Sequence, residues 1–347
     1  MASSVIAVPP WSTNITVTDG MPAASSSRYA IEMLACWLSF VTFNLGWVAM
    51  TSPKDDRWRR MRFICMMWPQ QFLAIVSRFL VMRLVKLASW EGLDHPALYW
   101  PLLLPIGVFE TWSIQAMADV YESRPVKPVC LKQVLNQLKI TTAESIGVTV
   151  GYKIWPWVRI DDPTVESLLH ATWRTFVFDI GLDIGFYTFH RVCHVNRTLY
   201  RWLHAQHHTD TAKEHGHLVA HETYEVSLVE AISILGSYLI GFELIGLLYN
   251  YTLFDIALLV SWAHLVELLG HTQMSWTVNG HPLRIIPEVL NLDLKVPDHT
   301  MHHTKPLSNF SKRLTLLDHL FGTYEPPGDE YGTITLKDLA KAKAKAA

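Results

Sequence analysis

The chain has 347 residues, of which half are hydrophobic and only 17% are charged, against roughly 25% charged in soluble domains. Its formal net charge is −2, which argues against nucleic acid as a partner, because nucleic-acid-binding domains carry strongly basic surfaces. The four cysteines form no C-x-x-C pair, so neither a thiolate zinc site nor a disulfide framework is indicated. These features favour a membrane-embedded protein of all-α class.

The N-terminal region begins with residues 1–30, which are polar and rich in Ser, Pro and Ala and predict a disordered tail. Residues 33–50 are uncharged and nearly long enough to cross a bilayer. The basic segment 54–62 follows, and the positive-inside rule places it in the cytoplasm. We therefore expect the tail to be lumenal.

Further apolar segments predict a multi-pass membrane helical bundle. A basic loop at 124–139 separates two of them and is again expected to be cytoplasmic. Residues 271–347 are polar and contain no further span, so the C-terminus is expected in the cytoplasm. The predicted hairpins pair 63–82 with 97–118, 142–158 with 167–189, and 227–249 with 252–270.

Histidine is the compositional anomaly, and the first motif is His190 with His194, spaced i and i+4. On a helix these rings lie one turn apart on the same face. Asp179, Asp183 and Tyr187 continue that face backwards within about 80° of arc. Ionisable groups in a span usually face a functional interior, and we expect Asp183 and Tyr187 to support the imidazoles from outside the ligand set.

The pattern H-x-x-H-H then occurs twice, once at 204–208 and once at 299–303. Offsets of three and four place the three rings of each copy on one helix face. His271 follows the last predicted span, and Glu267 stands one turn before it. Asp298 precedes the second copy. Both acids are predicted to support the histidine ligands. The nine candidate ligands are His190, His194, His204, His207, His208, His271, His299, His302 and His303.

Nine imidazoles exceed the need of one metal ion, since zinc takes about four ligands. Two metals are the economical interpretation, and iron suits imidazole ligation combined with redox chemistry. The clustered rings would together form a histidine-rich di-metal cap on the cytoplasmic side of the bundle. The remaining isolated histidines are interpreted as ordinary surface or core residues: His95, His170, His215, His217, His281 and His319.

These motifs in combination resemble the fatty acid hydroxylase/sterol desaturase superfamily of membrane di-iron oxygenases. The segment DIGFYTFHRVCH is similar to the family's first motif, and NGHPLRII with DHTMHH and LLDHLFGTYEPP resembles the tail of sterol C-5 desaturases and C-4 methyl sterol oxidases. Two positions differ from many relatives: Ser311 stands where Gly is usual and Leu317 where Trp is usual. The His221 segment HETYE also looks like a family segment, and His221 and His264 are the candidates for a tenth ligand.

The resemblance implies a protein of the endoplasmic reticulum membrane with two non-haem iron ions in its active site. It implies dioxygen as co-substrate and electrons from cytochrome b5 or an NAD(P)H-dependent reductase, supplied by a separate protein. The substrate would be a lipid, sterol or terpenoid/polyketide-type molecule that is hydroxylated, desaturated or otherwise oxidised at a C–H bond. The implied catalytic domain is 166–327, between N-terminal membrane helices at 31–165 and a cytoplasmic tail at 328–347.

The tail offers one further signal and leaves two interpretations open. Its last five residues, KAKAA, match the K-x-K-x-x dilysine retrieval signal of endoplasmic reticulum proteins, but an Ala/Lys-rich frayed helix end has the same composition.

Three other functions also compete with the oxygenase hypothesis. They are a membrane metal transporter or sensor, a bis-histidine haem protein, and an inactive family member that acts as a scaffold.

Overall fold

The computed structural model describes residues 23–90, 100–154, 165–210, 218–247, 253–277, 283 and 285–327. Within these ranges the chain is helical, with one isolated bridge between Asp293 and Leu314 and no strand, so the predicted all-α class is confirmed. The long helices are α1 (Ala23–Thr51), α2 (Arg57–Trp90), α3 (Trp100–Tyr121), α4 (Leu131–Ile154), α5 (Val165–Val195), α8 (Leu228–Gly246) and α9 (Leu253–Gly270).

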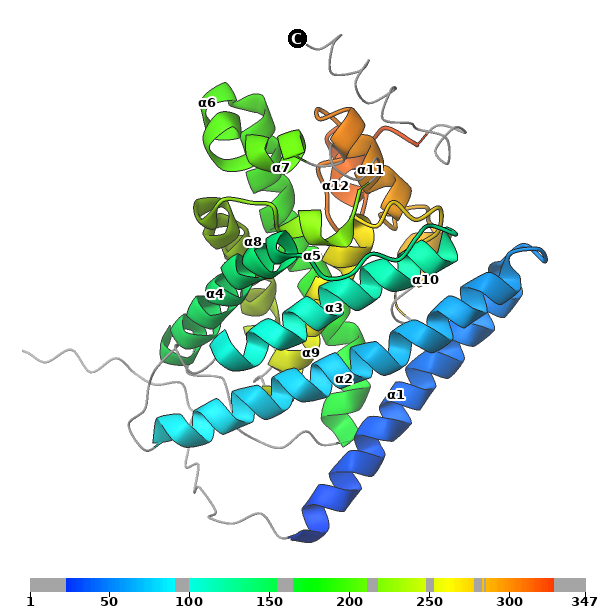
Figure 1. Ribbon diagram of the computed structural model, residues 1–347, viewed down its shortest axis with the longest axis vertical. Coiled ribbons are helices and arrows are strands. Elements are labelled where there is room, and N and C mark those ends of the chain that lie inside the picture. The colour runs from blue at the N-terminus through cyan, green and yellow to red at the C-terminus, as the bar shows by residue number, and fades with distance from the viewer. Residues whose placement is uncertain are drawn as a thin grey trace, which may run out of the picture.

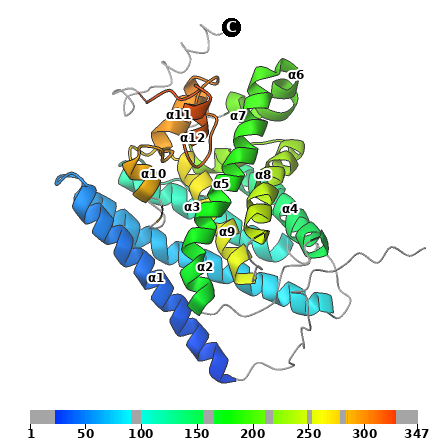
Figure 2. The ribbon, with the colours of Figure 1, turned by 180° about the vertical axis from the view of Figure 1, so that it is seen from behind.

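The short elements gather at one end of the molecule, around the upper ends of α5 and α9 (Figures 1 and 2). They are α6 (Arg197–Leu199), the π-helix η2 (Tyr200–His204), α7 (Ala205–Asp210), the 3₁₀-helix η3 (Ala220–Tyr224), α10 (Ile285–Val289), α11 (Val296–Thr304) and α12 (Leu316–Leu320). This end carries the histidine motifs, so the long helices act as a scaffold beneath them.

Every predicted span lies on a long helix as far as the chain is described, although parts of 97–118, 142–158, 227–249 and 252–270 fall outside the described residues. Among the described residues, two helical segments are long and apolar enough to cross a membrane, Arg57–Met82 and Leu228–Gly246. The predicted disordered tail at 1–30 is wrong at its end, because α1 begins at Ala23, and its residues 1–22 lie outside the described part of the chain. Residues 328–347, with the dilysine end, also lie outside it.

The predicted loop at 124–139 is wrong in its second half, because α4 begins at Leu131. Its polar side chains are buried rather than solvated: Gln133, Asn136 and Gln137 are each less than 5% exposed. The hydroxyl of Thr111 donates to Gln137 Oε1 at 2.9 Å, and Asn136 Nδ2 donates to the backbone oxygen of His221 at 3.4 Å. Buried partners of this kind stabilise a polar helix start that composition alone assigns to a loop.

Helices α5 and α8 approach closely because glycines line their contact. A Cβ atom on Gly181 would lie 2.8 Å from the Cα atom of Gly241, and one on Gly185 would lie 2.9 Å from the Cα atom of Ser237. Small residues let two helix backbones pack at short range. This contact fixes α8 beside the end of α5 that carries His190 and His194, and so it positions the site.

Candidate metal centre

The nine predicted ligands come from four separate parts of the chain and meet at one end of the molecule. The last turns of α5 carry His190 and His194, and His271 follows the last residue of α9. The remaining rings lie on η2 and α7 (His204, His207, His208) and on α11 (His299, His302, His303). Figures 1 and 2 show these elements side by side.

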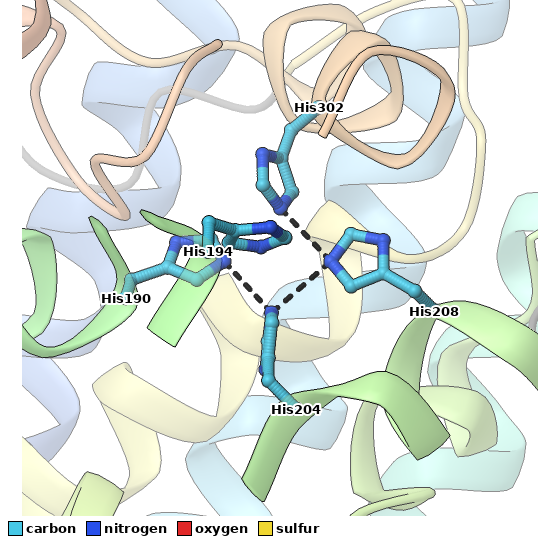
Figure 3. Close-up of side chains that lie close together, drawn as sticks. All are labelled: His190, His194, His204, His208 and His302. Atoms are coloured by element: carbon cyan, nitrogen blue, oxygen red, sulfur yellow. Dashed lines mark hydrogen bonds between the residues drawn. The ribbon is translucent and has the colours of Figure 1, made fainter. Parts of the chain in front are cut away.

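The rings form two groups, and in each the candidate ligand atoms lie within 4.8 Å of one another. Figure 3 shows the first group, in which rings from α5, η2, α7 and α11 point toward one centre. It consists of His190, His194, His204, His208 and His302. The second group consists of His207, His271, His299 and His303.

Nitrogen–nitrogen distances in the first group match the coordination sphere of a metal ion. The Nε2 atom of His204 lies 2.9 Å from that of His190 and 3.1 Å from that of His208, and His302 Nε2 lies 3.1 Å from His208 Nε2. Two imidazole nitrogens bonded to one ion at about 2.1 Å are about 3.0 Å apart at 90° and about 3.4 Å apart at the tetrahedral angle.

The hydrogen bonds of the Nδ1 atoms show which nitrogen of each ring carries the proton and which presents a lone pair to the centre of the group. His190 Nδ1 lies 2.8 Å from the backbone oxygen of Phe310, and His302 Nδ1 lies 2.7 Å from that of Ser308. A carbonyl oxygen only accepts, so in both rings Nδ1 carries the proton and Nε2 presents a lone pair.

His204 has the same arrangement, with Nδ1 2.5 Å from the Glu230 carboxylate. Its Nε2 lone pair therefore faces that of His190 at 2.9 Å. Two lone pairs repel at this distance, and a cation between them turns the repulsion into ligation. The donor set thus fits a metal ion.

The second group repeats this pattern around His271. Its Nδ1 atom donates to the backbone oxygen of Glu267 at 3.1 Å, which leaves a lone pair on Nε2. That Nε2 lies 3.3 Å from His207 Nε2 and 3.2 Å from His299 Nε2, and His299 Nε2 lies 3.3 Å from His303 Nε2. A second ion fits here by the same argument.

Each copy of H-x-x-H-H contributes to both groups. His204 and His208 point into the first group while His207 points into the second, and on α11 His302 joins the first while His299 joins the second. The π-helix η2 ends at His204, and its C-terminal N–H bond runs from Ala205 back to Tyr200. This wider turn, typical of functional sites, sets His204 apart from the regular helical register of α7.

Burial keeps these imidazoles neutral, which is the ligating form. Desolvation lowers the pKa of His271 to about 3 and that of His302 to about 4. The pKa values of His207, His208 and His299 are also well below the usual range, chiefly through burial. Lys312, whose ammonium lies 2.8 Å from the Glu267 carboxylate, adds a positive charge that disfavours protonation of His271 and His299.

The acids predicted to support the ligands act through the backbone rather than on imidazole rings. Asp183 accepts hydrogen bonds from the backbone N–H groups of Lys312, Arg313 and Leu314 at 2.7 to 3.0 Å. It thereby holds the segment whose Phe310 carbonyl orients His190. Asp298 accepts from the backbone N–H of Lys295 at 2.7 Å and so caps the start of α11.

The side chains of Tyr187 and Glu267 also contact groups other than the imidazole rings that they were predicted to support. The Tyr187 hydroxyl lies 3.0 Å from Thr323 Oγ1, so it ties α5 to the segment after α12. Glu267 orients His271 with its backbone oxygen, whereas its carboxylate pairs with Arg313 at 2.9 Å and with Lys312.

Sequence reasoning missed Glu230, the carboxylate that contacts His204. It is fully buried on α8, and the apolar run 227–239 contains no other charged residue. An ionisable residue inside an apolar segment is a functional-site signal, and that signal could have identified it. Lys312 and Arg313 carry no comparable signal, because they stand in a polar segment.

Of the two candidates for a tenth ligand, neither belongs to the two groups. His264 is held elsewhere, with Nδ1 3.0 Å from the Tyr224 hydroxyl. His221 lies in η3 and is buried. His319 is exposed, with its ring 4.2 Å from that of Tyr324. His95, His215, His217 and His281 lie outside the described residues.

Comparison with known proteins supports the family resemblance that the histidine motifs indicate. Residues 175–323 match the family model described as Fatty acid hydroxylase. Protein CER1-like 2 of Arabidopsis thaliana is 24% identical over 198 residues, which cover 56% of this chain and 29% of that protein. The chain thus matches under a third of its relative's length. No solved structure gives a significant match.

Proposed function

We propose that the chain is a membrane di-iron oxidoreductase of the fatty acid hydroxylase/sterol desaturase superfamily, because residues 175–323 match the family model described as Fatty acid hydroxylase. It would use dioxygen to hydroxylate, desaturate or otherwise oxidise a C–H bond of a hydrophobic substrate. The observation that carries the proposal is the convergence of nine buried imidazoles in one group of five and one of four. A haem protein needs only one or two axial histidines.

The chain's own residues would prepare the site in three ways. The carbonyls of Phe310 and Ser308 fix the tautomers of His190 and His302, so that both lone pairs face one point. Burial of the rings excludes water and keeps them neutral. Bound iron would supply the redox chemistry with dioxygen, and the protein supplies position and a dry environment.

A cavity of about 120 Å³ between α4, η3, α8 and α9 is the candidate substrate site. Its wall includes Ala231 and Glu267. Ala231 is the neighbour of Glu230, which contacts His204, and Glu267 orients His271. Through these two residues the cavity wall is linked to the helices that orient His204 and His271. Its apolar wall supports a hydrophobic substrate and is formed by Ile234, Leu235, Leu239, Phe242, Ile256 and Val260.

The cellular setting belongs to the same proposal. The two apolar segments Arg57–Met82 and Leu228–Gly246 support membrane insertion, and the basic segment 54–62 supports a cytoplasmic site and C-terminus. Electrons would come from cytochrome b5 or an NAD(P)H-dependent reductase. A transporter is less favoured, because its ligands would lie near the bilayer midplane rather than at the helix ends.

Comparative metabolite analysis tests this function. Cells that express the full chain would be compared with cells that express His303→Ala at the same membrane level. We expect at least one lipid-soluble compound that gains an oxygen atom or loses two hydrogen atoms only with the wild-type chain. A hydroxylated product should contain ¹⁸O when the cells are supplied with ¹⁸O₂. Identical profiles in the two strains would contradict the proposal.

A further inference from the structure

The polar part of the cavity lining includes Glu144 on α4 and His264 on α9, together with Tyr224, Tyr238 and Glu267. Both side chains are largely buried, at 7% exposure each. The Oε2 atom of Glu144 lies 3.8 Å from the Nε2 atom of His264. This distance is too long for a direct hydrogen bond, and both residues line the cavity.

The hydrogen bonds of His264 determine which of its nitrogens can donate. Its Nδ1 atom lies 3.0 Å from the Tyr224 hydroxyl and 3.4 Å from Nη2 of Arg78. A guanidinium only donates, so Nδ1 accepts and the imidazole proton is on Nε2. The cavity wall therefore offers an N–H donor on His264 beside a carboxylate acceptor on Glu144.

Arg78 stabilises this arrangement from behind without lining the cavity. Its guanidinium is 1% exposed, lies 2.5 Å from Glu110 Oε2 and 3.4 Å from Glu144 Oε1, and donates to Ser261 at 3.0 Å. Besides His264 Nδ1, the cation thus contacts two carboxylates and one hydroxyl. It leaves Glu144 Oε2 as the acidic atom available to a ligand, because the carboxylate of Glu267, which also lines the cavity, pairs with Lys312 and Arg313.

We infer that this pair is a recognition site for the hydroxyl group of an otherwise apolar, uncharged substrate. A hydroxyl oxygen about 2.8 Å from both atoms would accept from His264 and donate to Glu144. A carbonyl could satisfy only His264, and a carboxylate would face the charge of Glu144 in a desolvated site, which is costly. The inference rests on the proposed function, since it assigns the cavity to the substrate.

The same geometry places the hydroxyl away from the reacting carbon. His264 and His271 are seven residues apart, which corresponds to about 10 Å along a helix. The oxidised C–H bond therefore lies several bonds from the hydroxyl group. A cavity of about 120 Å³ encloses only part of a larger molecule, because a cavity of roughly 150 Å³ holds one benzene ring.

Binding of four probes with one carbon skeleton tests the inference without any turnover. The purified full chain in detergent would be titrated with decanol, decanal, decanoate and decane, and the shift of its melting temperature would be measured. We expect decanol to stabilise the wild-type protein most and decanoate least. Equal or stronger stabilisation by decanoate or decane, or no stabilisation by decanol, would overturn the inference.

Glu144→Gln makes the test specific. The amide removes the negative charge and gains an N–H donor, so we expect decanol to lose at least tenfold in apparent affinity and decanal and decanoate to gain. The control is Glu243→Gln, which makes the same change at an exposed carboxylate on α8 that does not line the cavity, and it should keep the wild-type order of probes. An unchanged order in Glu144→Gln would refute the inference. Because no oxidation is measured, an inactive protein with the expected order would count against the proposed function alone.

Discussion

The Nδ1 atom of His204 lies 2.5 Å from the Oε1 atom of Glu230, and both side chains are buried. This contact joins the first histidine group to α8, a helix that sequence motifs alone do not connect with the site. Carboxylate–histidine–metal relays of this kind fix the tautomer of the ring and raise its basicity as a ligand.

Glu230→Gln should weaken metal binding in the first group. The glutamine keeps the size of the side chain but removes the charge that favours the Nδ1-protonated tautomer, and loss of such a partner typically costs about 10–100-fold in metal affinity or activity. Iron retained by the purified protein after graded chelator treatment would measure the effect. Glu243→Gln, on the exposed side of the same helix, is the control and should retain iron as the wild type does.

Asp183→Asn should lower the stability of the fold, and it should have a smaller effect on metal binding by the histidines. Asp183 accepts three backbone N–H groups from residues 312–314, and the amide leaves some of these buried donors without an acceptor. Each unsatisfied buried group costs about 1–3 kcal/mol. Thermal unfolding of the purified protein should show a lower melting temperature. A melting temperature equal to that of the wild type would show that the carboxylate is not needed to hold this segment.

His303→Ala and His319→Ala should separate ligands from ordinary histidines. His303 Nε2 lies 3.3 Å from His299 Nε2 in the second group, so its loss should lower iron content and abolish turnover. His319 is exposed and stands outside both groups, and surface substitutions usually change stability by about 0.5 kcal/mol or less. Product formation with a cytochrome b5 reducing system would be measured beside iron content. Wild-type activity in His303→Ala would show that the segment DHTMHH (298–303) does not belong to the metal site.

Acid should destabilise the metal-free protein. Unfolded histidines titrate near pH 6.5, whereas burial lowers the pKa of His302 to about 4 and that of His271 to about 3 in the folded chain. The unfolded state therefore binds more protons, so this stability is fully present above about pH 6.5 and is lost as the pH falls toward 4 and 3. Melting temperatures of the chelator-treated protein between pH 8 and 4.5 would check this. A flat profile down to pH 5 would contradict it.

The sequence predicted the long helices and the nine clustered rings well, because apolar runs and i, i+3, i+4 spacings are local signals. It could not assign His207 and His208 to different groups, since that split depends on the π-helical turn at η2 and on how α11 faces α7. It placed Asp183 near the rings, but its hydrogen bonds to residues 312–314 depend on contacts between segments about 130 residues apart. The polar start of α4 was missed because its partners lie on α3 and η3.

The family resemblance is confirmed by the match over residues 175–323. The distribution of the rings refines what that resemblance implies, because it assigns each ring to one of two ion sites, with His194 in one and His299 in the other. A single substitution in either group should then affect one site more than the other.

Iron stoichiometry tests this claim most directly. Iron and protein would be quantified in the purified full chain, in His194→Ala and in His299→Ala. We expect two iron ions per wild-type chain, and close to one in each variant after mild chelation, with haem absent from the optical spectrum. One ion per wild-type chain, a haem spectrum, or no stoichiometric metal in protein that is folded and in the membrane would contradict the two-site account.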